Sequence, residues 1–328
     1  MTEYVYGTIN GLGKALGNYA VMTMEVPWKL LKDRIGGEPR AVTMVTGLEH
    51  AYLDQLVNEL PAVDTVVGIG GGIATDAAKY FAWKRKCSLV LAPTIVSVNA
   101  YATPAAAVRE PDGRVNYTGN VSPSKVVVDY AAIQAAPKRL NTAGTGDIYS
   151  CRTALFDWRL AHEKRGESYD EEIAAGSQRI LDRLVANADE IKNVSEKGIR
   201  TLVELHIETN RLQVLAGKAR PEEGSEHIFF YTLENLTRRE FVHGEVVGTG
   251  IFVLTHFQSA EEDHVASVMD KMGLMFRPRD YGITHEQFVN TTIEMKRYAR
   301  EKKMFFSVLD TVEITKDDAE ELWRKLSA

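Results

Sequence analysis

Along roughly its first 140 residues, the chain alternates short apolar runs with segments whose apolar residues recur at helical spacing. Five runs are predicted to be strands: 19–24, 41–46, 64–69, 89–92 and 126–129. A helix beginning at Pro27 is predicted after the first run, and others after the second and third. Strands that are apolar throughout and alternate with helices predict a parallel sheet covered on both faces. Between the last two strands, residues 105–121 alternate around Pro111-Asp112-Gly113, which predicts a β-hairpin.

The period of the pattern changes after about Ala136, where strand-like runs nearly vanish and helical spacing dominates to the C-terminus. A chain of 328 residues is also long for a single hydrophobic core. We therefore predict two domains, an α/β domain over residues 1–140 and an all-α domain over residues 141–328.

Composition narrows the class of protein. Hydrophobic residues make up 45% of the chain and charged residues 26%, as in an ordinary globular enzyme. A net charge of -6 without a basic face argues against a nucleic-acid partner. We find neither a signal peptide nor an apolar run long enough to span a bilayer, so no membrane partner is expected. Two cysteines, Cys87 and Cys151, suit a reducing cytoplasm.

A glycine loop follows the third predicted strand. Gly70, Gly71 and Gly72 lead directly into a helix, so backbone N–H groups at its N-terminus can face a phosphate. The loop lacks the G-x-G-x-x-G spacing of the usual dinucleotide fingerprint. Strand-to-helix turns also carry glycine for steric reasons alone, and that interpretation stays open.

Other polar residues are predicted at the same carboxyl edge of the sheet, where doubly wound folds bind ligands. Asp76 either complements the helix dipole or contacts a cofactor. Thr94 and Ser97 either bind a nucleotide or cap the next segment. Glu25, just after the first predicted strand, is a weaker candidate for accepting hydrogen bonds from ribose hydroxyls.

One carboxylate and two imidazoles form an open, catalytic type of divalent-metal site, with a further position free for water or substrate. The candidates are Asp147 in a glycine-flanked turn, His227 in Gly-Ser-Glu-His, and His243 in His-Gly-Glu. His227 and His243 lie 16 residues apart (243 − 227), so two elements must converge to bring them together. Cys151 is interpreted as a buried small hydrophobe. Five other histidines have no comparable surroundings: His50, His162, His206, His256 and His264. His285 lies in a polar stretch.

The ordered set of motifs resembles the glycerol dehydrogenase and glycerol-1-phosphate dehydrogenase branch of the metal-dependent alcohol dehydrogenase and dehydroquinate synthase-like superfamily. The resemblance spans nearly the whole chain. It rests on the glycine loop with Asp76, Pro93-Thr94-x-x-Ser97, the run from Pro137 to Asp147, Gly224-Ser225-Glu226-His227, and His243-Gly244-Glu245-x-Val247-Gly248. It implies an N-terminal Rossmann-like nucleotide-binding domain with a mostly parallel sheet, followed by a helical metal-binding domain.

Residue by residue, the resemblance implies that Asp147, His227 and His243 are the metal ligands and hence the catalytic set. Gly70, Gly71, Gly72 and Asp76 match the family's cofactor loop, and Thr94 and Ser97 its nucleotide-contacting segment. We expect NAD or NADP and a divalent metal, with Zn²⁺ favoured by the Asp-His-His set although other divalent ions fit it. The resemblance also suggests a homo-oligomer.

The implied activity is NAD(P)-linked interconversion of a small polyol or polyol phosphate, of the glycerol-1-phosphate and dihydroxyacetone phosphate type, with its ketone or aldehyde. Two substrate-binding positions depart from the family. Asn99 stands where members commonly carry an Asp, and Tyr231 lies where another His is usual. The alternatives are a sugar-phosphate cyclase of the dehydroquinate synthase type, which uses NAD transiently, and a cofactor-binding protein without turnover.

Overall fold

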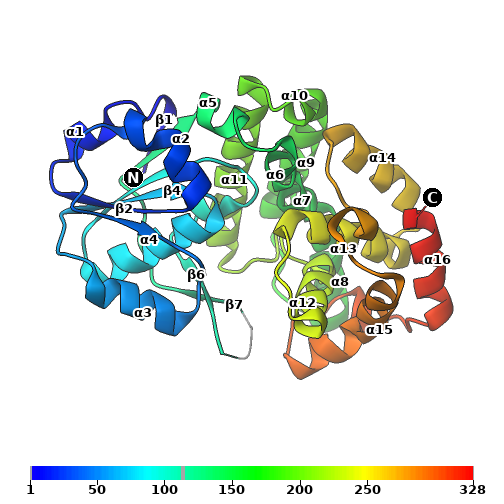
Figure 1. The fold of residues 1–328 in the computed structure, drawn as a ribbon. Coiled ribbons are helices and arrows are strands. Elements are labelled where there is room, and N and C mark those ends of the chain that lie inside the picture. Colours follow the sequence, from blue (N-terminus) through cyan, green and yellow to red (C-terminus); the bar gives the residue numbers. More distant parts are fainter. Residues whose placement is uncertain (1, 112–114, 328) are drawn as a thin grey trace. The chain divides into compact units, whose positions relative to one another are not determined.

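The computed structural model describes residues 2–111 and 115–327. The chain divides into two compact units, Met1–Asn141 and Thr142–Ala328. The first contains the strands and the second is built from helices (Figure 1).

A six-stranded parallel sheet forms the centre of the first unit. Across the sheet, its strands are β1 (Glu3–Gly7), β8 (Lys125–Asp129), β5 (Ser88–Pro93), β4 (Thr65–Gly70), β2 (Tyr19–Thr23) and β3 (Ala41–Met44). Every residue of β2 and β4 is buried, because helices cover both faces of the sheet. The fold class predicted from the sequence, an α/β Rossmann-like unit with a mostly parallel sheet followed by an all-α unit, is confirmed.

Five of the helices in this unit surround the sheet: α1 (Leu12–Leu16), α2 (Glu25–Ile35), α3 (His50–Glu59), α4 (Gly72–Arg85) and α5 (Tyr130–Gln134). Figure 1 shows α1 and α2 on one face of the sheet and α3 and α4 on the other. On the α2 side, Leu31 and Ile35 pack against Val67 and Ile69 of β4. This packing holds the carboxyl end of β4, and the glycines that follow it, in a fixed place.

Two predictions of detail are corrected by the structure. Strand β1 was not among the predicted strands, because it is a partly exposed edge strand without a continuous apolar run. Helix α2 begins at Glu25 and not at Pro27. Proline fits there because the first turn of a helix needs no N–H donor from it.

The predicted hairpin is present as the antiparallel pair β6 (Ala106–Arg109) and β7 (Val115–Thr118). Asp112 and Gly113, which were predicted to form its turn, lie outside the described residues. A short 3-10 helix, η1 (Asn99–Tyr101), precedes the hairpin.

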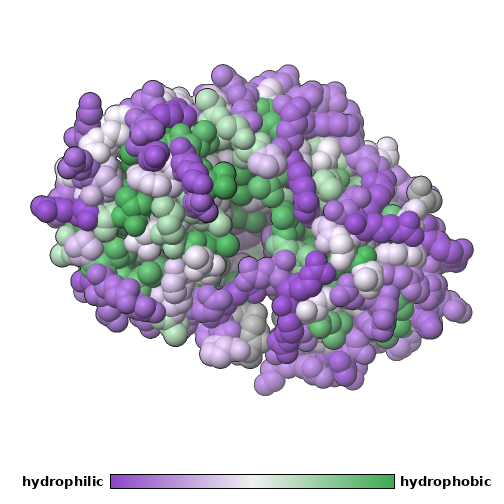
Figure 2. All heavy atoms as spheres, in the orientation of Figure 1, coloured by the Kyte–Doolittle hydropathy of each residue, from purple (hydrophilic) through white to green (hydrophobic). Residues whose placement is uncertain are grey.

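The second unit is helical throughout its described part. Helix α6 (Lys138–Thr142) leads into it, and its helices are α7 (Gly144–Tyr149), α8 (Cys151–Arg165), α9 (Glu171–Ala186), α10 (Ala188–Lys192), α11 (Glu196–Ala216), α12 (Ser225–Thr237), α13 (His243–Gln258), α14 (Glu262–Met272), α15 (His285–Glu301) and α16 (Lys316–Ser327), with 3-10 turns η2 (Pro278–Tyr281) and η3 (Val308–Asp310). Helix α13 is buried over most of its length and forms the centre of the unit. Hydrophilic side chains cover most of the C-terminal helices on the face shown in Figure 2. None of the described helices is both long and apolar enough to cross a membrane.

A buried carboxylate ties three of these helices together. Glu262, at the start of α14, is 4% exposed. It accepts hydrogen bonds from Nδ1 of His256 on α13 at 3.0 Å and from Nζ of Lys325 on α16 at 2.6 Å. Burial alone disfavours its charged form, but these two donors outweigh burial and lower the pKa of Glu262 from 4.5 to about 2.

Glu262→Gln is expected to lower the free energy of unfolding by about 2 kcal/mol at neutral pH, because it removes charge-assisted hydrogen bonds. Since the pKa of Glu262 is lower in the folded chain, the folded state binds fewer protons. The contribution of Glu262 to the free energy of unfolding is therefore present above pH 4.5 and is lost as pH falls toward about 2. Denaturant unfolding at several pH values measures this. The control is Glu321→Gln, whose half-exposed carboxylate also pairs with Lys325, at 3.2 Å, and should contribute only a few tenths of a kcal/mol. Equal losses in both variants would contradict the assignment.

Candidate functional site

The glycine loop lies at the end of β4. Gly70 has a φ of +148°, and a Cβ there would stand 2.9 Å from Cβ of Ala74. A Cβ on Gly71 would stand 2.7 Å from Cδ1 of Ile95. Steric crowding therefore explains why positions 70 and 71 are glycine. At Gly72, the first residue of α4, the nearest atom to a Cβ lies 3.4 Å away, so packing demands glycine least there.

Three polar segments share the carboxyl edge of the sheet with this loop, because β4 pairs with β2 on one side and β5 on the other. Glu25 follows β2, is exposed, and pairs with Lys29 at 2.6 Å. Thr94 and Ser97 follow β5 and are buried, and the N–H of Thr94 donates to the carbonyl of Gly70 at 3.1 Å. Asn99 begins η1.

Asp76 lies inside α4 and is 5% exposed. It forms an ion pair with Nζ of Lys79 at 2.6 Å. Burial raises the pKa of Asp76 in spite of that lysine. The Lys79 ammonium also donates to the carbonyl of Ala100 at 2.9 Å, so the pair fastens the η1 segment to α4. A structural role for Asp76 is thus visible, and a cofactor contact stays a prediction.

Asp147, His227 and His243 come together within the second unit from α7, α12 and α13. One ligand atom from each lies within 4.8 Å of the others. Nε2 of His243 is 2.9 Å from Oδ1 of Asp147 and 3.3 Å from Nε2 of His227, which is itself 4.0 Å from Oδ1 of Asp147. Asp147 and His227 are buried, and His243 is partly exposed. The sequence placed Asp147 in a turn, and the structure places it in a helix.

Glycines explain the close approach of the helices that carry these ligands. A Cβ on Gly146 of α7 would lie 2.1 Å from the carbonyl oxygen of Gly244 on α13. A Cβ on Gly244 would lie 1.8 Å from the carbonyl oxygen of Ala143. The two backbones therefore touch directly, which brings Asp147 and His243 together. Gly146, directly before Asp147, therefore serves helix contact and not a turn.

The charges around the three side chains favour a cation. Burial opposes an imidazolium at His227, but its hydrogen bond to Glu226 and the charges of Glu223, Glu226 and Asp147 raise its pKa to about 9. Burial would raise the pKa of Asp147, yet His243, His227 and His206 hold it below the ordinary value. A site that stabilises positive charge in this way suits a metal ion, and its N and O donors are those of zinc sites.

Two residues near the ligands were not singled out from the sequence. Glu226 is fully buried, and one of its oxygens accepts from Nδ1 of His227 at 2.7 Å. Its position beside His227 in Gly-Ser-Glu-His was an available signal. The second is His206, whose sequence surroundings are not comparable to those of the proposed ligands. It is fully buried, and its Nε2 donates to the carbonyl of Gly144 at 3.2 Å. Burial lowers the pKa of His206 to about 4.

Tyr231, one of the two departures from the family pattern, lies one helical turn after His227. Its hydroxyl donates to Oε1 of Glu223 at 3.1 Å, and its ring centroid is 6.3 Å from that of His227. The phenol and carboxylate therefore border the ligand set. Cys151 is fully buried, and burial raises its pKa, so its interpretation as a small hydrophobe agrees with the structure.

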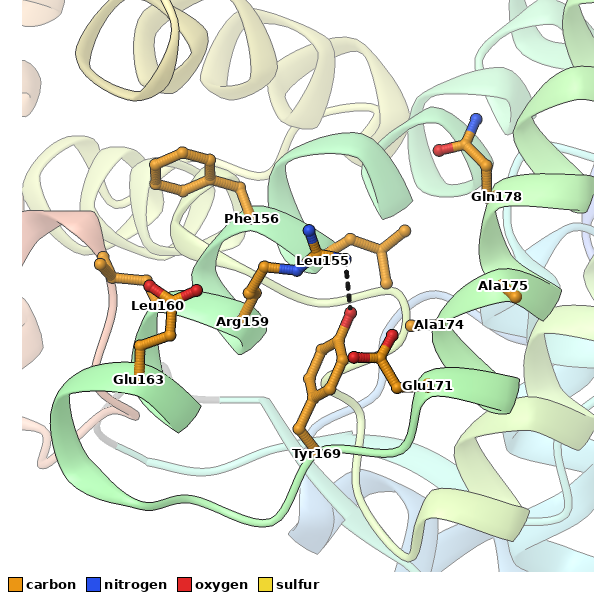
Figure 3. Close-up of a pocket in the computed structure, with 10 residues that line it drawn as sticks. All are labelled: Leu155, Phe156, Arg159, Leu160, Glu163, Tyr169, Glu171, Ala174, Ala175 and Gln178. Atoms are coloured by element: carbon orange, nitrogen blue, oxygen red, sulfur yellow. Dashed lines mark hydrogen bonds between the residues drawn. The ribbon is translucent and has the colours of Figure 1, made fainter.

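A cavity of about 530 Å³ lies elsewhere in the second unit, between α8 and α9 (Figure 3). Leu155, Phe156 and Ala174 are among the apolar residues lining it, and Arg159 donates to the hydroxyl of Tyr169 there at 3.3 Å. None of the three ligand residues lines it. The chemistry therefore points to the Asp-His-His set and not to this cavity.

The structure combines a parallel sheet that leads into a glycine loop with a helical unit that carries an Asp-His-His set, the features expected from the family that the motifs resemble. Comparison with known proteins agrees. Residues 19–137 match the family model of the iron-containing alcohol dehydrogenases. The glycerol-1-phosphate dehydrogenase (NAD(P)+) of Hyperthermus butylicus is 30% identical over 83% of this chain and 78% of its own length. The enzyme of that name from Thermofilum pendens is 30% identical over 90% of this chain and 86% of its own.

Among solved structures, a probable glycerol dehydrogenase from Sinorhizobium meliloti shares the fold, with a TM-score of 0.74 and 22% identity over 99% of this chain and 96% of that one. The chain belongs to the iron-containing alcohol dehydrogenase superfamily, in its glycerol and glycerol-1-phosphate dehydrogenase branch. It is an oxidoreductase. The family resemblance stated from the motifs is confirmed.

Proposed function

We propose that this protein is a metal-dependent NAD(P)-linked dehydrogenase that interconverts a small polyol or polyol phosphate with its ketone or aldehyde. One observation carries the proposal: Asp147, His227 and His243, far apart in sequence, bring three ligand atoms within 4.8 Å of one another. The printed names of the relatives, glycerol-1-phosphate dehydrogenases that use NAD(P)+, support the choice of substrate and cofactor. The glycerol-1-phosphate and dihydroxyacetone phosphate pair is the substrate we favour.

Asp147, His227 and His243 would hold the metal, and we favour Zn²⁺ because two imidazoles and one carboxylate suit it. When bound, the metal supplies Lewis acidity that lowers the pKa of a substrate hydroxyl or polarises a carbonyl. The three side chains would thereby fix where the substrate oxygen binds, and the burial of Asp147 and His227 would limit competing water. Tyr231 and Glu223 lie close enough to His227 to contact other hydroxyls of the substrate.

The first unit would bind the nucleotide at the carboxyl edge of its sheet. Gly72 leaves room for a phosphate near the N-terminus of α4. Thr94, Ser97 and Glu25 lie at the same edge, and we assign them to the nucleotide, with Asn99 as a substrate contact. The cofactor would accept or donate the hydride. We further propose a homo-oligomer in the cytoplasm.

The first test follows oxidation of NADH and NADPH by absorbance with dihydroxyacetone phosphate, dihydroxyacetone and small aldehydes, each with zinc and after chelation. We expect turnover of the phosphate that falls by at least about 10³-fold on chelation, because metal assistance lowers the barrier by several kcal/mol. Re-adding zinc should restore it. Turnover that survives chelation would contradict the metal assignment. Nucleotide binding without turnover of any carbonyl would contradict the proposed activity and favour a cyclase or a binding protein.

A further inference from the structure

Both carboxylate oxygens of Glu226 accept hydrogen bonds from the surrounding protein. It lies in the first turn of α12 and is fully buried. Its Oε1 accepts from the backbone N–H of Gly224 at 2.6 Å and from Nδ1 of His227 at 2.7 Å. Its Oε2 accepts from the hydroxyl of Thr153 on α8 at 2.6 Å. Three donors therefore fix both oxygens of one side chain that faces a candidate metal ligand.

The bond to Nδ1 determines how His227 presents its other nitrogen. A neutral imidazole carries one proton, and a carboxylate at Nδ1 holds that proton there. The lone pair then lies on Nε2, the atom that is 3.3 Å from Nε2 of His243 and 4.0 Å from Oδ1 of Asp147. Without the carboxylate, the proton could occupy Nε2 and the ring could rotate. Either change would remove a ligand from the set.

Helix α8 holds the turn that carries Glu226 and His227. Thr153 bonds Glu226, and one turn later Oδ2 of Asp157 accepts from the N–H of Ser225 at 2.7 Å. Asp157 is itself fully buried. Two residues on one face of α8 thus fasten the first turn of α12, so Glu226 cannot swing away from His227.

We propose that Glu226 is a positioning residue for the metal site: it fixes the tautomer and the orientation of His227 through Nδ1, and Thr153 holds it in place. This inference rests on the proposed function, since it assigns a role toward the metal. Its consequence is measurable as metal affinity, apart from any activity. Partners of this kind in other metal sites change affinity by about 10- to 100-fold when they are replaced.

The test measures the Zn²⁺ dissociation constant by competition with a chromophoric chelator for the wild type, Glu226→Gln and Glu223→Gln. Glu226→Gln keeps the shape of the side chain and should weaken zinc binding by about 10- to 100-fold. Glu223→Gln is the matched control, because Glu223 also acts on the charge of His227 but does not bond to it. Its partly exposed carboxylate should change affinity by no more than about fivefold.

A spectroscopic readout separates positioning from a merely structural role. In zinc-loaded protein labelled with ¹⁵N-histidine, the Nδ1–H of His227 should give a proton signal protected from exchange. That signal should exchange with solvent faster in Glu226→Gln, whose neutral amide oxygen is a weaker acceptor than the carboxylate, and should be unchanged in Glu223→Gln. If Glu226→Gln fails to fold, Thr153→Val tests the same role. It removes one of the hydrogen bonds to Glu226 without altering its charge, and should weaken zinc binding by about tenfold.

The possible failures are distinguishable. A wild-type protein that binds no zinc would overturn the metal assignment and the role of Glu226 with it. Zinc binding that is unchanged in Glu226→Gln, or in Thr153→Val if that variant is needed, would overturn only the role of Glu226. Equal losses in Glu226→Gln and Glu223→Gln would mean that charge alone matters, and the positioning role would be overturned.

Discussion

His243→Ala is expected to abolish metal-dependent turnover, by about 10³-fold or more, while nucleotide binding stays nearly unchanged. The imidazole supplies one of three converging donors, and its Nε2 lies 2.9 Å from Asp147 Oδ1 and 3.3 Å from His227 Nε2. Two remaining ligands make an incomplete site, and loss of the metal removes several kcal/mol of assistance to the reaction. The glycine loop belongs to the other compact unit of the chain, and His243 is not among the residues assigned to the cofactor.

Three measurements check this prediction: zinc content after dialysis, turnover with zinc present, and the dissociation constant for NADH or NADPH. The control is His264→Ala, because His264 is an exposed histidine on α14 and should leave all three unchanged. A His243→Ala variant that retains zinc and turnover would remove His243 from the ligand set. One that loses nucleotide binding together with zinc would show that the two functions are coupled.

The sequence predicted the strands and helices whose burial is visible in the pattern of their own residues. Strands β2, β4 and β5 are buried on both faces, so they appear as continuous apolar runs. The ligands could be named because Asp147, His227 and His243 stand in distinctive glycine-rich contexts that resemble a family. Their convergence is then found in the structure. Edge strand β1 carries a mixed burial pattern, and its pairing with β8 is a contact 122 residues away (125 − 3) that no local pattern reveals.

The residues that surround and support the metal ligands could not be predicted, because their partners also lie far away in the sequence. His206 lies on α11 and its bond to the carbonyl of Gly144 joins positions 62 residues apart. Thr153 reaches Glu226 across 73 residues. Such partners are ordinary residues in sequence, and their role comes only from helix packing. Asp147 was expected in a turn because glycines flank it in the sequence. In the structure, Gly146 instead permits two helices to touch.

Gly146→Ala is expected to damage the metal site although position 146 supplies no ligand. The added Cβ would stand 2.1 Å from the carbonyl oxygen and 2.7 Å from Cα of Gly244. Both are backbone atoms, so no flexible side chain can move aside. Helices α7 and α13 must separate, and they carry Asp147 and His243. Metal sites require ligand positions held to a few tenths of an ångström. Zinc affinity should therefore fall by at least about 100-fold, with a loss of about 1–3 kcal/mol in the free energy of unfolding.

Competition with a chelator measures the affinity, and denaturant unfolding measures the stability. Gly7→Ala is the control, since a Cβ at Gly7 would meet nothing within 4 Å and its φ lies outside the left-handed region; neither quantity should change. Gly146→Ala differs from Glu226→Gln in a useful way, because it moves whole helices and should lower stability and affinity together. If it lowered stability but left zinc affinity intact, the spacing of α7 and α13 would not set the ligand geometry. Asp147 and His243 would then have to adjust through their side chains alone.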